Sequence, residues 1–230
     1  MIYYISLVIV FVPFAIGLVK FKNFNIELKI FFIFVAYGVF NETLSAVLVK
    51  VIGVRSNMPQ AHFYGVVTFL TVCIFYRFLL NGFIKQKWID AVIALYTIYY
   101  FMNSLFLQSI YVYPGIANAI GSIIILSLVI LHFAKVMQEA KIRNLFAEPL
   151  IWISAALLIF YSVNLFFLVL FNLLLDFSTE FTTLVVYFRV GFNVLVYTMI
   201  SIGFLKHKRY SLSKPAGKVN QSPGKTPSNS

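Results

Sequence analysis

The most constraining feature of the sequence is the arrangement of its positive charges around seven long apolar segments. These segments cover residues 2–19, 30–52, 62–80, 89–107, 116–135, 150–173 and 182–205. A helix of about 20 apolar residues spans the roughly 30 Å of bilayer hydrocarbon, and each segment is close to that length. The sequence therefore predicts an all-α integral membrane protein built as a seven-transmembrane-helix bundle.

The positive charges indicate how this bundle is oriented. The connections on one side carry only Lys50 and Arg55, and Arg189 lies inside the last segment. The other fifteen of the 18 Lys and Arg residues lie on the opposite side, at positions 20, 22, 29, 77, 85, 87, 135, 141, 143, 206, 208, 209, 214, 218 and 225. Positive residues are retained on the cytoplasmic side of a membrane. We therefore predict an outside N-terminus and a cytoplasmic C-terminus, in a multi-pass protein of the cell (inner) membrane.

The composition excludes a soluble fold and divides the chain into two regions. Hydrophobic residues make up 61% of the chain and charged residues 11%, whereas a soluble globular protein is about 25% charged. Residues 1–209 are predicted to form the transmembrane domain, and residues 210–230, rich in Ser, Pro, Gly and Lys, a disordered basic cytoplasmic tail. The net charge of +11 follows from the cytoplasmic Lys and Arg. We therefore expect anionic lipid at that face as a partner, and no nucleic acid.

Polar side chains inside the apolar segments mark the candidate functional site. They are costly in hydrocarbon, so they usually face the bundle interior and often carry function. Five segments supply the ten candidate ligand-binding residues: Asn41, Glu42, Tyr64, Thr68, Tyr100, Asn103, Tyr161, Asn164, Arg189 and Asn193. At about 1.5 Å of rise per residue, Glu42 lies roughly 15 Å and Arg189 roughly 10 Å below the outer helix ends. We therefore expect a cavity between the second, third, sixth and seventh segments that opens outward and is closed toward the cytoplasm.

Glu42 and Arg189 are the only acid and base expected well inside the hydrocarbon, and three interpretations of them stay open. In the first, they form a buried ion pair that locks the second and seventh segments together, because an unpaired charge there is strongly destabilising. In the second, they line a ligand site in which Arg189 binds an anionic group. In the third, Glu42 carries a proton during transport.

The sequence contains no recognisable catalytic, metal or cofactor motif. HExxH and GxSxG are absent, and no pair of aspartates lies within the segments. The last segment has no lysine for a retinal Schiff base, and His62, His132 and His207 are scattered. We therefore predict no catalytic residue, no metal ligand and no cofactor, and an enzyme is the less favoured class.

Two stretches of the chain resemble other membrane proteins. They are EPLIWISAALLIFYSVNLFFLVLFN at 148–172 and AHFYGVVTFLTVCIFYRFLL at 61–80. Both resemble a group of small, uncharacterised seven-helix membrane proteins of bacteria. The resemblance covers about a fifth of the chain, and it implies the seven-helix fold alone.

From these observations we expect a receptor-like or sensory membrane protein. It would bind a small molecule in the outward-facing cavity and signal through a separate cytoplasmic protein that contacts the basic inner loops and tail. A small-solute transporter, with Glu42 as a proton carrier, is the alternative. A lipid-modifying membrane enzyme is a third interpretation.

Overall fold

The computed structural model describes residues 2–139, 145–174 and 179–207, and of residues 2–7, 169–174 and 179–186 it describes the backbone only. The described residues form seven α-helices and contain no strand, which confirms the predicted all-helical fold. The helices are α1 (Ile2–Lys20), α2 (Ile26–Lys50), α3 (Met58–Leu79), α4 (Gln86–Met102), α5 (Gly115–Glu139), α6 (Pro149–Leu174) and α7 (Thr179–Lys206). A π-helical turn, Asn103–Leu107, extends α4. The predicted tail at 210–230 lies outside the described residues.

Six of these helices, α2 to α7, are long and apolar enough to cross a membrane over their described residues. These helices agree with the apolar segments predicted from the sequence to within a few residues. The chain is therefore a multi-pass membrane protein by the length and composition of its helices. The first apolar segment coincides with α1, which has 19 residues and contains no charged residue before Lys20.

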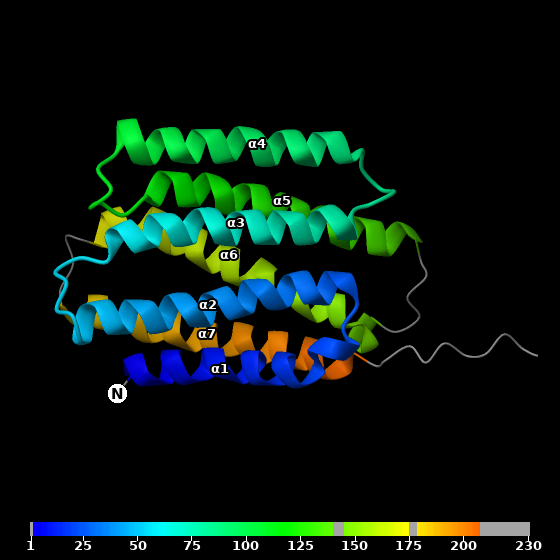
Figure 1. Ribbon diagram of the computed structural model, residues 1–230, viewed down its shortest axis with the longest axis horizontal. Coiled ribbons are helices and arrows are strands. Elements are labelled where there is room, and N and C mark those ends of the chain that lie inside the picture. The colour runs from blue at the N-terminus through cyan, green and yellow to red at the C-terminus, as the bar shows by residue number, and fades with distance from the viewer. Residues whose placement is uncertain (1, 140–144, 175–178, 208–230) are drawn as a thin grey trace, which may run out of the picture.

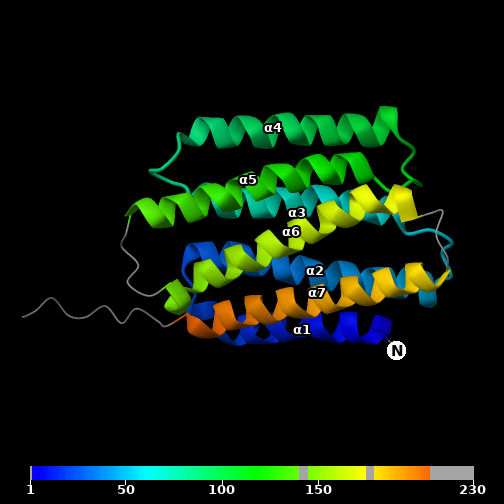
Figure 2. The same ribbon diagram turned by 180° about the vertical axis from the view of Figure 1, so that it is seen from behind.

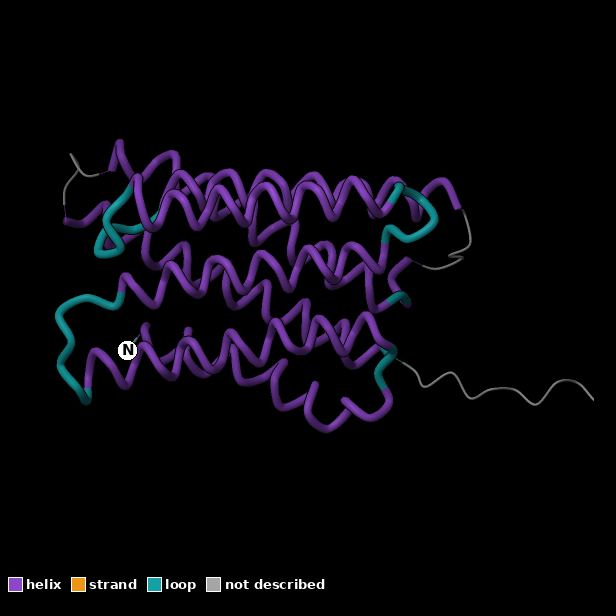
Figure 3. Tube along the Cα trace, turned by 45° about the horizontal axis from the view of Figure 1, so that its top comes forward, coloured by secondary structure: helices purple, strands orange, loops and turns teal. Residues whose placement is uncertain are grey.

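The seven helices form a ring of six with one helix outside it (Figures 1 and 2). Around the ring, α1, α2, α3, α5, α6 and α7 each pack against the next, and α7 packs against α1. α4 lies outside the ring, against α3. In Figure 2, α6 crosses the bundle obliquely between α5 and α7. The described connections gather at the two ends of the bundle (Figure 3).

Local sequence features set several helix ends. The side chain of Asn25 caps α2 by accepting a hydrogen bond from the Leu28 amide at 3.1 Å. Pro59 lies in the first turn of α3, and Pro149 begins α6, where a missing amide proton costs nothing. Gly82 follows α3 with a φ of 79°, a left-handed conformation that favours glycine. The chain can therefore reverse direction within a few residues.

One end of the bundle, which we call the basic end, contains the connections at 21–25 and 80–85 and the last turn of α7. Lys20 Nζ donates hydrogen bonds to the carbonyl oxygens of Leu205 at 2.7 Å and Phe204 at 3.3 Å. Lys135 Nζ donates likewise to Leu79 O at 2.7 Å and Asn81 O at 2.8 Å. Each lysine places a positive charge at the negative end of a helix dipole and satisfies carbonyls that have no partner within the helix. The basic residues therefore also tie the helix ends together.

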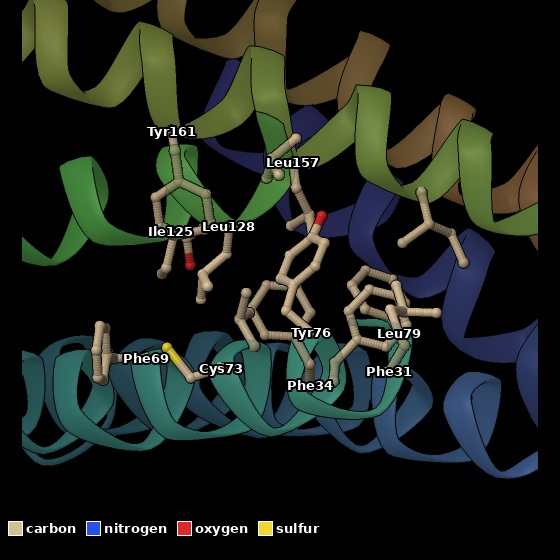
Figure 4. Packing of buried hydrophobic residues seen from close by; sticks show 14 of the residues in the cluster. Phe31, Phe34, Phe69, Cys73, Tyr76, Leu79, Ile125, Leu128, Leu157 and Tyr161 are labelled. Atoms are coloured by element: carbon tan, nitrogen blue, oxygen red, sulfur yellow. The ribbon is translucent and has the colours of Figure 1, made fainter. Parts of the chain in front are cut away.

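The half of the bundle next to the basic end is filled with large apolar side chains. Phe31, Phe75 and Phe204 are fully buried there, and the ring of Phe31 lies 5.1 Å from that of Phe75 and 6.1 Å from that of Phe204. Figure 4 shows this packing, with Phe31 and Leu79 beside Tyr76 between α3 and its neighbours. Close packing of this kind fills the space between these helices with side chains.

Glu148, just before α6 at the basic end, should make stability depend on pH. Its partial burial raises the pKa of the carboxyl group, and the nearby His207 opposes that shift. The folded chain therefore holds this proton more tightly than the unfolded chain, so the stabilising contribution is complete below the unfolded pKa and is lost as pH rises through the folded pKa. We expect Glu148→Gln to raise the thermal unfolding midpoint at pH 7 and to leave it unchanged near pH 4, measured in detergent. A pH-independent difference would contradict this assignment.

Candidate functional site

A cavity of about 320 Å³ occupies the half of the bundle away from the basic end. It lies toward what we call the cavity end, which contains the connections at 51–57 and 108–114. Ligand sites generally have volumes of about 300–1,000 Å³, so this cavity suits a small molecule. Its lining comes from α2 to α7 and from two connections: Phe34, Asn41, Glu42, Ser45, Asn57, Ala61, Tyr64, Gly65, Thr68, Phe69, Tyr96, Tyr113, Asn118, Gly121, Ser122, Ile125, Phe160, Tyr161, Asn164, Leu168 and Arg189.

Seven of the ten residues predicted from the sequence line this one cavity. They come from four helices, and they are Asn41, Glu42, Tyr64, Thr68, Tyr161, Asn164 and Arg189. Six of them lie in the halves of their helices nearer the cavity end, and Tyr161 lies at the middle of α6. The structure therefore brings the polar side chains of α2, α3, α6 and α7 together.

The other three predicted residues lie outside the cavity lining. Tyr100 is buried on α4, where its hydroxyl donates to Asn118 Oδ1 at 3.5 Å. Asn103 begins the π-helical turn and donates to Gln108 Oε1 at 3.2 Å. Asn193 lies on α7, one turn nearer the basic end than Arg189. The first two were misplaced because α4 lies outside the ring, so polar groups on it need not face the centre of the bundle.

The cavity extends further than the four helices expected from the sequence. α4 contributes Tyr96, and α5 contributes Asn118 and Ser122. Tyr96 reaches the lining because it lies against Gly121, where any side chain would collide with its ring. Its hydroxyl donates to Ala117 O at 2.9 Å. The sequence signal for this wall is the small pair Ala117 and Gly121, four residues apart, which permits close helix contact.

Glu42 and Arg189 face the same cavity but do not form the direct ion pair that one interpretation required. Two ion pairs within 4.0 Å occur among the described residues, Arg77–Asp90 and Lys135–Glu139. Glu42 and Arg189 do interact electrostatically across the cavity. Both side chains keep accessible surface. The interpretation in which a direct carboxylate–guanidinium contact joins α2 to α7 is therefore wrong.

Some polar groups of the lining are already engaged within the protein. Thr68 Oγ1 donates to Tyr64 O at 2.7 Å, and Ser122 Oγ donates to Asn118 O at 2.7 Å. Asn41 Oδ1 accepts from Gln60 Nε2 at 2.9 Å, which leaves the Asn41 amide nitrogen as a donor. These contacts fix the walls and orient Asn41 toward the cavity.

A second set of polar groups in the lining has no hydrogen-bond partner within the described part of the chain. This set comprises the side chains of Glu42, Arg189, Tyr64, Tyr161 and Asn164. A polar group without a partner in a low-dielectric site is costly, so such groups are normally satisfied by water or a ligand. The set supplies one negative charge, one positive charge, two hydroxyls and one amide for binding.

Below the cavity, a buried chain of hydrogen bonds joins α3, α6 and α5. The Tyr76 hydroxyl donates to Ser154 Oγ at 3.2 Å, and a hydrogen bond of 2.9 Å joins Ser154 Oγ to His132 Nδ1. In Figure 4, the Tyr76 hydroxyl points from α3 toward α6. Ser154 is completely buried and His132 nearly so. This serine–histidine contact is not visible in the sequence spacing, and its burial keeps it from any substrate in the cavity.

At the cavity end, His62 connects α3 to the connection after α4. Its Nε2 donates to Val112 O at 2.9 Å, so its Nδ1 accepts from Ser104 Oγ at 2.8 Å. The ring is therefore engaged through both nitrogens. Within the described part of the chain, no three His, Cys, Asp or Glu side chains lie close enough together to hold a metal ion.

Comparison of the chain with known protein families, with curated proteins and with solved structures found no match. The proposals below therefore depend on the geometry of the cavity and on the distribution of charge.

Proposed function

We propose that the protein is a seven-span receptor-like or sensory protein of the cell (inner) membrane that binds a small molecule in this cavity. α1 would be the seventh span. The N-terminus would lie outside and the C-terminus in the cytoplasm, because the basic end carries nearly all the Lys and Arg of the connections. The cavity would then open to the outside.

The observation that carries this proposal is the difference between the two halves of the bundle. One half contains a cavity whose lining presents Glu42, Arg189 and unengaged hydroxyl and amide groups. The other half is closed by buried aromatic rings and by the Tyr76–Ser154–His132 chain. A polar cavity near one end of the bundle, with apolar packing toward the other end, supports binding of a ligand rather than passage through a continuous pore.

Signal output would pass through a separate cytoplasmic protein. The basic end offers exposed lysines for an acidic partner surface or for anionic lipid, among them Lys22 and Lys85 and Lys206 near the start of the predicted tail. The resemblance of residues 61–80 and 148–172 to small bacterial seven-helix membrane proteins is part of this proposal.

A receptor should bind its ligand without moving it across the bilayer. We expect a small polar solute to raise the unfolding midpoint of the purified full chain, and the same solute to show no uptake into proteoliposomes. We also expect an acidic cytoplasmic protein to copurify from native membranes, and charge removal at Lys22 and Lys85 to weaken that association. Stabilisation accompanied by uptake would instead assign transport.

A small-solute transporter is the second candidate, and the accessible carboxylate of Glu42 in the cavity favours it. A carboxylate facing a hydrated intramembrane site is suited to bind and release a proton. For a transporter we expect uptake that depends on the pH gradient, and loss of that dependence in Glu42→Gln. The third candidate, a lipid-modifying enzyme, has less support, because the contact between Ser154 and His132 is buried.

A further inference from the structure

The two opposite charges of the cavity are separated by space rather than joined to each other. Glu42 on α2 and Arg189 on α7 both contribute to the lining, and no contact within 4.0 Å joins them among the described residues. Hydrocarbon surrounds the bundle, so each charge needs a counter-charge or strong hydrogen bonds nearby. The space between them therefore has a positive wall and a negative wall.

A ligand that pairs with both Glu42 and Arg189 must carry one positive and one negative charge. A singly charged molecule would pair with one wall and leave the other side chain unpaired, and a neutral molecule would pair with neither. The charges of a zwitterion are complementary to both, and its net charge of zero leaves the cavity neutral. Such complementarity gives specificity, because each wrong partner leaves one of the two charges in the lining unmatched.

The remaining lining fits the rest of such a molecule. Phe34, Phe69 and Phe160 form apolar wall, together with the ring faces of Tyr64 and Tyr161. Tyr64 lines the same cavity as Glu42, and an aromatic ring in the lining favours a cationic group. Arginine binds carboxylate and phosphate groups through paired N–H donors. The amide nitrogen of Asn41 remains available as a further donor.

We propose that the ligand of this cavity is a small zwitterion with a partly apolar body, whose ammonium group binds Glu42 and whose carboxylate or phosphate group binds Arg189. This inference depends on the proposed ligand-binding function and names its ligand class. The same chemistry occurs in free amino acids and in the headgroup of phosphatidylethanolamine. Both sources would place the anionic group on α7 and the ammonium group on α2.

The test measures binding to the full-length protein in nanodiscs of phosphatidylglycerol, a lipid without an ammonium group. The free probes are L-leucine, L-phenylalanine and glycerophosphoethanolamine, whose phosphodiester carries a single negative charge. The lipid probe is phosphatidylethanolamine added to the disc. Isoamylamine and isocaproate are the singly charged analogues of leucine, and phenethylamine and hydrocinnamate are those of phenylalanine. We expect at least one zwitterion to bind, and its two singly charged analogues to bind at least tenfold more weakly. Binding of free probes assigns a solute, and binding of the lipid alone assigns a headgroup.

Variants separate charge recognition from general damage to the fold. Glu42→Gln and Arg189→Gln should each weaken zwitterion binding at least tenfold, whereas Arg55→Gln and Glu27→Gln, which lie outside the cavity lining, should not. The double variant with both Gln substitutions leaves no lone charge, so it should fold, and it should lose the preference for zwitterions over their singly charged analogues. Equal binding of zwitterions and singly charged analogues, or no binding of any zwitterion, would overturn the zwitterion assignment. A singly charged or neutral probe that binds would leave the proposed ligand-binding function intact.

Discussion

Replacement of Phe204 by Ala should lower the free energy of unfolding by about 3 kcal/mol. Phe204 is completely buried where α1, α2 and α7 meet. Its ring lies 5.1 Å from that of Phe24 and 6.1 Å from that of Phe31, and it approaches Gly17 of α1. Lipid tails are as apolar as a protein interior, so the loss comes mainly from packing contacts that cannot re-form around the smaller side chain.

The matched control for this prediction is Phe166→Ala. Phe166 lies on α6 and is 61% exposed on the outside of the bundle. Its removal should change stability by less than about 0.5 kcal/mol. Both variants can be measured by reversible unfolding in mixed micelles of a mild detergent and dodecyl sulfate. Equal losses for the two variants would show that the aromatic cluster at the basic end does not hold α1 and α7 together.

Ser154→Ala should produce the second large loss of stability, on the order of 2 kcal/mol. The serine hydroxyl connects Tyr76 and His132 within a completely buried site. Its removal leaves the tyrosine hydroxyl and a histidine nitrogen without partners, and each orphaned buried group carries a desolvation cost. The measured unfolding free energy of the purified variant checks this expectation.

Ser201→Ala is the control for Ser154→Ala. Ser201 is also buried, but its hydroxyl donates to Tyr197 O of its own helix at 2.8 Å. No other side chain depends on it, so its replacement should change stability by less than about 0.5 kcal/mol. If the two serine variants behave alike, the Tyr76–Ser154–His132 chain contributes nothing beyond ordinary packing.

The apolar segments and the depth of the polar residues were predictable because they follow from helix rise and the cost of polarity in hydrocarbon. These rules placed Glu42 and Arg189 in the same half of the bundle, and both line one cavity. The order of helices around the bundle does not follow from such rules. The sequence therefore could not reveal that α4 lies outside the ring, which displaced Tyr100 from the expected site.

Distances between side chains on different helices could not be predicted from the sequence either. The cost of an unpaired charge in hydrocarbon predicted that Glu42 and Arg189 lie in the same region of the bundle. It could not show whether the two side chains touch or are separated by a cavity. The hydrogen bond between Ser154 and His132 likewise depends on how α5 and α6 cross. Residues 22 positions apart carry no periodic signal of their proximity.

The oblique course of α6 has a mechanical consequence. Asn164 and Tyr161 reach the cavity from this helix, and Ser154 anchors the same helix in the closed half. Ten residues, about 15 Å of rise, separate Asn164 from Ser154. A helix is stiff, and Ser154 would act as a pivot for α6. A ligand that displaces the part of α6 beside the cavity would therefore move the start of α6 in the opposite direction. The start of α6, where Trp152 lies beside Lys206 at the end of α7, would move most in such a swing at the basic end.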